Sequence, residues 1–210
     1  MTRLVRSGAD GMGQQMRLFC RAVVALILFA TIGGCETNVP PRKYPDLRYT
    51  HLPPIRLDAV RVDVVRKYRP TAAKPHVEHE FPVQPATVAT NWARDRLQAA
   101  GVGNIVRATV VDAGVVEVPM KRTTGVTGVF TTDQSERYDG TLEIMIEIIG
   151  PDGRRLAMVS SKASRSRTVP ENITLANRET AWFRMTESMM NDVNLALERQ
   201  IREHFRPWLR

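Results

Sequence analysis

The sequence predicts an α+β fold: a two-layer sandwich in which a small antiparallel or mixed sheet of about four strands carries two helices on one face. Two observations predict it. Several stretches alternate apolar and polar residues with a period of two, as half-buried strands do, and two stretches repeat apolar residues at steps of three and four, as amphipathic helices do. Along the chain the order is β-α-β-β-β-α, and residues 55–206 are expected to form a single domain.

The first strand is predicted within residues 55–68, where Val60, Val62 and Val64 alternate with mostly charged neighbours. Residues 67–82 contain three prolines and predict a loop. A helix of about 16 residues is expected to begin at Pro85, since proline suits a first helical turn, and to end before Gly101.

Residues 105–118 are rich in valine and predict one strand, with Ala113-Gly114 as the place where a break would fall. Residues 121–134 predict a loop or an irregular hairpin tip. A clearly alternating strand at 138–149 then meets a returning strand at 155–167 through Gly150-Pro151-Asp152-Gly153, whose proline and glycine are typical of a tight turn.

The last helix is predicted over residues 174–205, which lack interior glycine and proline and end before Pro207. Residues 207–210 are expected to be a tail. One stripe of this helix carries Met185, Met189 and Met190, and methionine at helical spacing is typical of a core, although flexible thioethers also serve at binding faces.

The N-terminal part predicts export. Residues 16–34 contain arginines, then the apolar run 22–30, then small residues, which is the layout of a secretory signal. The apolar run is shorter than the roughly 20 residues that a membrane-spanning helix needs. Residues 1–15 are expected to be an upstream start extension, with Met16 or Met12 as the true start.

The sequence Ile32-Gly33-Gly34-Cys35 resembles the lipobox of bacterial lipoproteins. The resemblance implies that Cys35 becomes the acylated N-terminus of the mature chain; an ordinary signal peptide is the alternative. Residues 35–54, with five prolines, are expected to form a tether, which docking of Tyr44 and Tyr49 onto the domain would shorten.

Charge and cysteine content exclude several classes of protein. The chain has 30 basic and 22 acidic residues, and removal of residues 1–34 lowers the formal charge from +8 to about +5. The charges are spread along the chain, so no nucleic-acid partner is predicted. Of the two cysteines, Cys20 leaves with the signal and Cys35 is the proposed acylation site, which excludes a disulfide, a zinc-thiolate site and a cysteine nucleophile in the domain.

No catalytic constellation is predicted, and neither an enzyme activity nor a cofactor or metal is expected. The segment His76-Val77-Glu78-His79-Glu80 lacks the spacing of a helical metal site and predicts a solvated loop, with metal binding as the weaker alternative. Glu143 and Glu147 share one strand face and are expected to be its solvent-facing side.

The basic stretch 162–167 is the candidate binding segment. Lys162, Arg165 and Arg167 are candidates for contacting an anionic ligand, because guanidinium groups bind phosphate in a bidentate manner. The alternative is an edge strand whose charges guard it against aggregation.

The lipobox, the proline-rich tether, the strand meander with its Pro-Asp-Gly turn and the long methionine-containing helix together resemble the small bacterial envelope lipoproteins. The element order resembles the LptE family of LPS-assembly lipoproteins, and in outline the PqiC-like and YajG-like lipoproteins. Glu-Thr-Asn-Val-Pro after Cys35 departs from the usual LptE start.

The resemblance implies a non-enzymatic accessory of envelope assembly or transport, anchored by lipid to the outer membrane and facing the periplasm. Its expected partners are a β-barrel or a transporter subunit, with lipopolysaccharide or phospholipid as a ligand. Glu36 in place of aspartate implies no retention at the inner membrane. The alternatives are an inner-membrane auxiliary subunit of an ABC-type lipid transporter and a periplasmic hydrolase.

Overall fold

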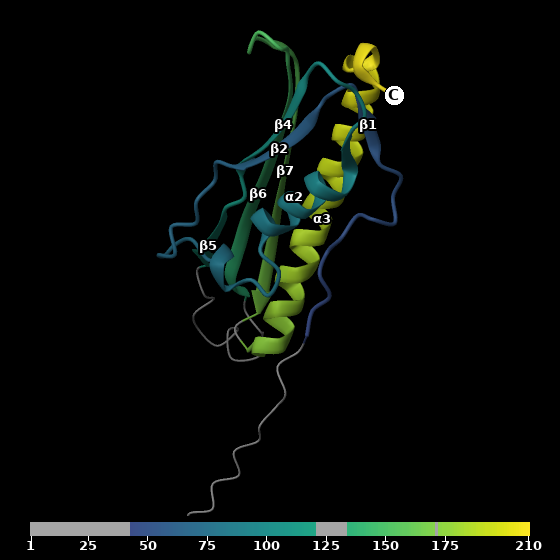
Figure 1. Ribbon diagram of the computed structural model, residues 1–210. Coiled ribbons are helices and arrows are strands. Elements are labelled where there is room, and N and C mark those ends of the chain that lie inside the picture. Colours follow the sequence, from purple (N-terminus) through teal and green to yellow (C-terminus); the bar gives the residue numbers. More distant parts are fainter. Residues whose placement is uncertain (1–42, 121–133, 171) are drawn as a thin grey trace, which may run out of the picture. The chain divides into compact units, whose positions relative to one another are not determined.

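The computed structural model describes residues 43–120, 134–170 and 172–210 (Figure 1). The predicted start extension, the predicted signal sequence, the lipobox-like segment with Cys35 and the 121–133 part of the predicted loop lie outside the described residues. In chain order the described elements are β1 (Ile55–Leu57), β2 (Arg61–Arg66), the 3-10 helix η1 (Glu78–Glu80), α2 (Pro85–Arg96), β3 (Leu97–Ala99), β4 (Ile105–Asp112), β5 (Val115–Pro119), β6 (Gln134–Ile149), β7 (Arg155–Pro170), α3 (Leu175–His204) and the 3-10 helix η3 (Arg206–Trp208). Neither helix in the described part of the chain combines the length and the apolar character needed to cross a membrane.

The long hairpin β6–β7 supplies the two longest strands of the main sheet, β6 inside it and β7 at its edge. Its strands pair antiparallel over their whole length, from Gln134 opposite Pro170 to Ile149 opposite Arg155. The predicted turn joins them: the Gly153 backbone N–H donates to the Gly150 carbonyl at 2.9 Å, and Gly153 takes a φ of 78°, which glycine adopts without steric cost.

The strand predicted over 105–118 is broken where the sequence indicated, at Ala113-Gly114. β4 pairs antiparallel with the second half of β6, and β5 pairs with the first half, so both occupy the same side of β6. β2 then extends the sheet in parallel to β4. This break is why the sheet has five strands where about four were predicted.

The first predicted strand and the end of the first helix differ from expectation for one shared reason. Residues 55–57 leave the main sheet and pair in parallel with residues 97–99, so β1 and β3 form a separate two-stranded sheet. Helix α2 therefore ends at Arg96, and Leu97 takes an extended backbone. Burial of Leu57 and Leu97 in this pairing outweighs the weak preference for continuing the helix.

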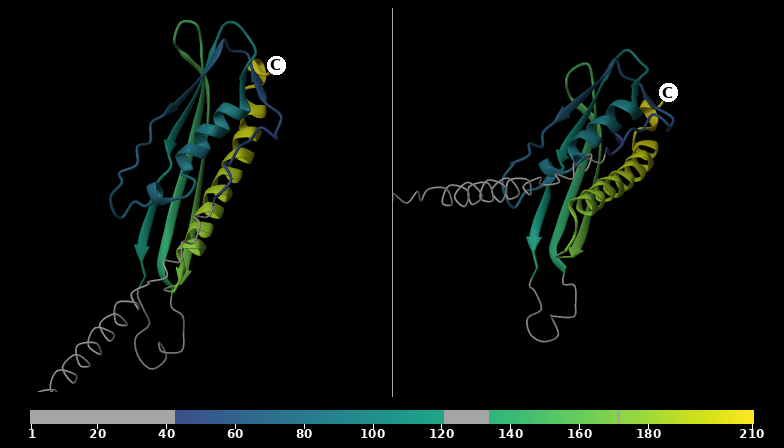
Figure 2. Two further views of the ribbon diagram at one scale, coloured as in Figure 1. Left: turned by 60° about the horizontal axis from the view of Figure 1, so that its bottom comes forward. Right: turned by 90° about the horizontal axis from the view of Figure 1, so that it is seen from below.

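The two helices cover one face of the sheet, which confirms the predicted α+β arrangement (Figure 2). Alternate residues of β6 point into this interface and are fully buried against the apolar stripe of α3. They include Leu142, Ile144, Ile146 and Ile148 on the strand and Met189, Met190, Val193 and Leu197 on the helix. The methionines at helical spacing therefore belong to the core.

The opposite face of the sheet carries paired charges. Glu143 lies 3.9 Å from the Lys162 ammonium, and Glu147 lies 3.2 Å from an Arg155 guanidinium nitrogen. These carboxylates are the solvent-facing side that the alternation predicted.

The segment before β1 runs along the helices (Figure 1). The Tyr44 hydroxyl lies 3.1 Å from Thr180 Oγ1, and its ring lies 5.3 Å from that of Phe183. Tyr49 is buried, and its backbone N–H donates to Asp95 Oδ2 at 2.9 Å. Both tyrosines of the predicted tether thus dock onto the domain.

The C-terminal residues also pack. Leu209 forms a bridge with Leu57, and the Arg210 backbone N–H donates to the Arg56 carbonyl at 3.0 Å. Residues 207–210, expected as a tail, lie against β1.

Candidate anion-binding groove between α3 and β7

The structure divides the three basic residues that the sequence singled out. Successive side chains of a strand point to opposite faces. Arg165 and Arg167 share the helix-covered side with the buried Ala163, which faces Leu142, whereas Lys162 lies on the other side, beside Glu143. Only the two arginines can therefore act together.

A groove runs between the second half of β7 and the first half of α3, and it is made of two adjoining hollows of about 130 and 310 Å³. Both hollows are lined by Arg167, Ala181 and Arg184. Met185 contributes to the smaller hollow and Val169 to the larger one, and both side chains are almost fully buried. The groove thus has an apolar base and a basic rim.

The charges on the rim are only partly compensated. The Arg165 guanidinium pairs with Asp192 and donates to Ser188 Oγ at 3.3 Å. Arg167 and Arg184 are exposed and have no ion pair with any residue of the described ranges. These two guanidinium groups are consequently available to an anion.

The neighbouring charges on the other face of the sheet are internally satisfied. Hydrogen bonds from the Arg137 guanidinium and from Ser166 hold the pKa of Asp139 below its usual range. Next to the groove, Arg178 pairs with Glu136 at 3.2 Å. Among the described residues that line the groove, the arginines without an ion pair are therefore Arg167 and Arg184.

Arg184 was not among the residues predicted from the sequence. A signal for it was present: Arg184 directly precedes Met185, at the border of the apolar stripe of α3. What the sequence alone could not give is which strand lies beside that border.

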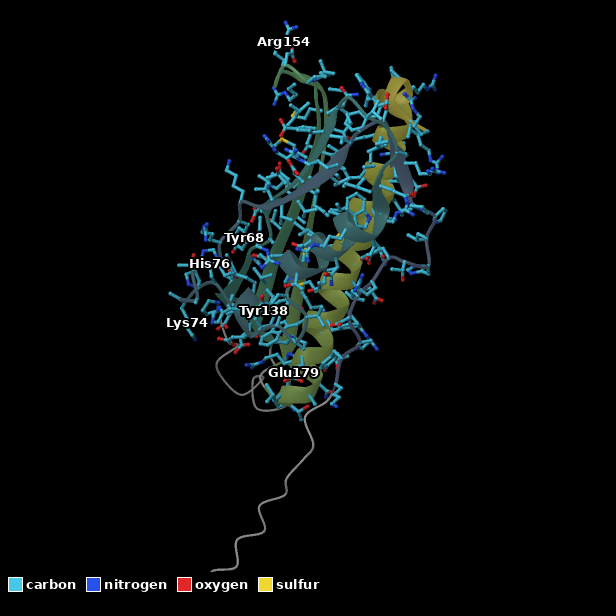
Figure 3. The ribbon with its side chains drawn as sticks, viewed as in Figure 1. Tyr68, Lys74, His76, Tyr138, Arg154 and Glu179 are labelled. Carbon is cyan, nitrogen blue, oxygen red and sulfur yellow. The ribbon has the colours of Figure 1, made fainter. Side chains whose placement is uncertain are left out.

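The prediction that residues 76–80 form a solvated loop is wrong for Glu78, because its side chain is buried. The Tyr68 hydroxyl donates to Glu78 Oε1 at 2.6 Å, and the Val115 backbone N–H donates to Oε2 at 3.2 Å. Burial, reinforced by this hydrogen bond, raises the pKa of Tyr68. Tyr68 and His76 lie near each other beside β5 in Figure 3. Glu78 therefore fastens the loop to β5.

Metal binding, the weaker alternative for this segment, gains no support from the geometry. His76 Nδ1 lies 3.8 Å from Glu78 Oε2, and His79 Nε2 lies 3.7 Å from Glu80 Oε1. Within residues 43–120, 134–170 and 172–210, no three histidine, cysteine, aspartate or glutamate side chains gather closely enough to hold a metal ion.

Comparison with protein-family models gives no match, and comparison with curated proteins gives none either. Among solved structures, the chain is similar to the dodecamer of a PelC variant from Paraburkholderia phytofirmans, with 16% sequence identity and a TM-score of 0.19. The similarity covers 60% of this chain and 85% of that one. A TM-score this low supports no argument about function.

Proposed function

We propose that this chain is a non-enzymatic lipoprotein of the cell envelope, anchored through Cys35 to the outer membrane, that serves as an assembly or transport accessory by binding. The observation that carries the proposal is the α3–β7 groove, where Arg167 and Arg184 form a rim of free positive charge over an apolar base. Such a rim suits an anionic partner, whether a protein or the phosphate of lipopolysaccharide or phospholipid.

The N-terminal segment 43–54 supports this assignment, because it begins beside the end of α3 that lines the groove. Tyr44 contacts Thr180 and Phe183, which belong to the half of α3 that also lines the groove. The nine residues from Cys35 to Tyr44 span at most about 30 Å when fully extended. A lipid on Cys35 would thus hold Tyr44 within about that distance of the membrane surface.

Three carboxylates that the sequence singled out have partners in the fold. Glu143 and Glu147 lie beside Lys162 and Arg155, and Glu78 is held by Tyr68 and Val115. These contacts favour binding over catalysis as the function of the domain.

Labelling cells with radioactive palmitate tests the anchor. The wild-type chain is expected to take up label and Cys35→Ala to take up none. Equal labelling of the two would overturn both the anchor and the membrane placement.

Crosslinking in cells tests the function. A photoreactive amino acid at Asn177, which is exposed and lines the groove, is expected to capture an outer-membrane β-barrel protein, whereas the same probe at exposed Arg199 should not. Capture of an ATPase or permease at Asn177 would contradict the proposal and support the alternative, an inner-membrane auxiliary subunit of an ABC-type lipid transporter.

A further inference from the structure

We infer that the groove accepts an extended acidic segment of a partner protein, which pairs with the free edge of β7 as an additional strand. The inference rests on the proposed function for the existence of a protein partner. It adds the chemistry of that partner and the manner of its binding.

The first step is that β7 is an edge strand. Of its 16 residues, 15 pair with β6, and no second strand within the described ranges pairs with it. Helix α3 packs on the face of the sheet, where Val159, Ser161 and Ala163 are buried. One row of backbone N–H and C=O groups along β7 therefore lacks a strand partner, and such a row is a template for another chain.

The second step is that the groove follows this edge. The residues that line it on the strand side are consecutive, from Arg165 to Pro170. Consecutive side chains point to opposite faces, so a hollow lined by all of them runs beside the backbone of the strand and not over one face. Six residues correspond to about 20 Å, the length of a short added strand.

The third step is the distribution of charge along the strand. In the first half of β7, Arg155 and Lys162 are neutralised by Glu147 and Glu143 on β6. In the second half, Arg167 has no such partner among the described residues, and Arg184 faces the same groove from α3. Opposite charges on adjacent strands stabilise their pairing, which selects a segment with acidic side chains at alternate positions.

The same charges argue against two other occupants. Two copies of β7 pairing through this half would bring their free arginines together, and like charges on adjacent strands destabilise pairing. A lipid phosphate would satisfy Arg167 and Arg184 but would leave the backbone row unpaired. Strand addition satisfies both features, with main-chain bonds for affinity and side chains for specificity.

Synthetic peptides test the inference on the full-length protein, held in neutral phosphatidylcholine nanodiscs if it carries a lipid and in solution if it does not. We expect a labelled peptide of alternating glutamate and valine to bind, and a lysine–valine peptide not to bind. A glutamate–proline peptide of equal charge should bind at least tenfold more weakly, because proline lacks the backbone donor and holds φ at about −65°, away from the roughly −120° to −140° of a paired strand. Equal binding of the glutamate–valine and glutamate–proline peptides would overturn strand addition.

Hydrogen exchange of the backbone amides distinguishes strand pairing from a purely electrostatic contact with the arginine side chains. Binding of the glutamate–valine peptide should slow the exchange of alternate amides within residues 164–169, since only every second amide of a strand points to its free edge. Unchanged exchange of the β7 amides would refute the inference. If the protein binds no peptide and binds only vesicles that contain phosphatidylglycerol, the inference is also refuted and a lipid headgroup is favoured as the ligand.

Charge reversal completes the test. Arg167→Glu and Arg184→Glu should each weaken peptide binding at least tenfold, whereas Arg199→Glu, exposed on the same helix, should leave it within twofold. Circular dichroism verifies that each variant is folded, and Arg184→Gln provides a milder variant if reversal disturbs folding. If Arg167→Glu and Arg184→Glu weaken peptide binding no more than Arg199→Glu does, the inference is also refuted.

The two proposals can fail separately. If palmitate labelling and β-barrel capture succeed but the peptide does not bind, strand addition is wrong and the proposed function stands. If the peptide binds through Arg167 and Arg184 but Cys35 carries no lipid, the binding mode stands and the membrane placement is wrong.

Discussion

The Trp92 indole Nε1–H donates to Asn194 Oδ1 at 2.7 Å and thereby joins α2 to α3 inside the helix layer. Both side chains are buried, so neither group can replace its partner with bulk water. This bond adds a buried polar contact to the apolar packing that holds the two helices together, and α3 forms one wall of the groove.

Replacing Asn194 with alanine should lower the free energy of unfolding by about 1 to 3 kcal/mol, because the buried indole N–H loses its acceptor. Urea denaturation measures the change. Asn191→Ala, at an exposed position of the same helix, is the control and should change stability by less than about 0.5 kcal/mol. A loss no larger than that of the control would mean that the bond is not needed for stability.

Two nearby glycines should respond to alanine with opposite signs. A Cβ on Gly101 would lie 2.8 Å from Asp58 Cα, a backbone atom that cannot easily move, whereas a Cβ on Gly103 would meet no atom within 4 Å. We expect Gly101→Ala to destabilise the protein by about 1 to 3 kcal/mol. Gly103→Ala should stabilise it by up to about 1 kcal/mol through loss of unfolded-chain entropy. Thermal unfolding compares the two, and equal effects would contradict the packing around Asp58.

The elements that the sequence predicted correctly are those whose burial pattern is set by local periodicity. The alternation from Leu142 to Ile148 and the stripe from Met185 to Leu197 each identify a buried face without reference to the rest of the chain. The β1–β3 pair was missed because it joins residues 55–57 to residues 97–99, and no local pattern reports a pairing of such separation.

The candidate site was predicted in part for a similar reason. Side chains of a strand alternate between its two faces, so Lys162 lies on the opposite face from Arg165 and Arg167, and this could have been predicted from the sequence. The contribution of Arg184 depends on the placement of α3 beside β7. Likewise, Glu78 looked solvated because its partners, Tyr68 and Val115, are brought to it only by the fold.

Docking of the N-terminal segment should depend on pH at the acidic side. Hydrogen bonding to Arg48 and to the Tyr49 N–H holds the pKa of Asp95 below its ordinary value of about 4. The stability that this carboxylate contributes is therefore present above about pH 4 and is lost as the pH falls through the lowered pKa.

The variant Asp95→Asn should cost about 1 to 2 kcal/mol at neutral pH, since Arg48 is half exposed and its attraction is screened. It should also remove part of the acid-side slope of stability. Urea denaturation at several pH values measures both effects. Asp46→Asn, at an exposed position of the same segment, affects Arg48 only weakly and should change both far less than Asp95→Asn does. An unaltered slope in Asp95→Asn would mean that the ion pair does not hold the segment in place.

Alkaline pH should unfold the domain through its tyrosines. Burial raises the pKa of Tyr49, Tyr68 and Tyr138, and hydrogen bonds to Glu78 and Glu136 raise it further for the last two. In the unfolded chain these phenols ionise at about pH 10, so stability is present below that pH and falls as the pH rises above it. Three of the four tyrosines should therefore ionise only as the protein unfolds.

Phenolate absorbance and circular dichroism, recorded together, should change over the same pH range. Tyr68→Phe should make the fall in stability less steep, and full ionisation near pH 10 with the fold intact would refute the burial of these side chains.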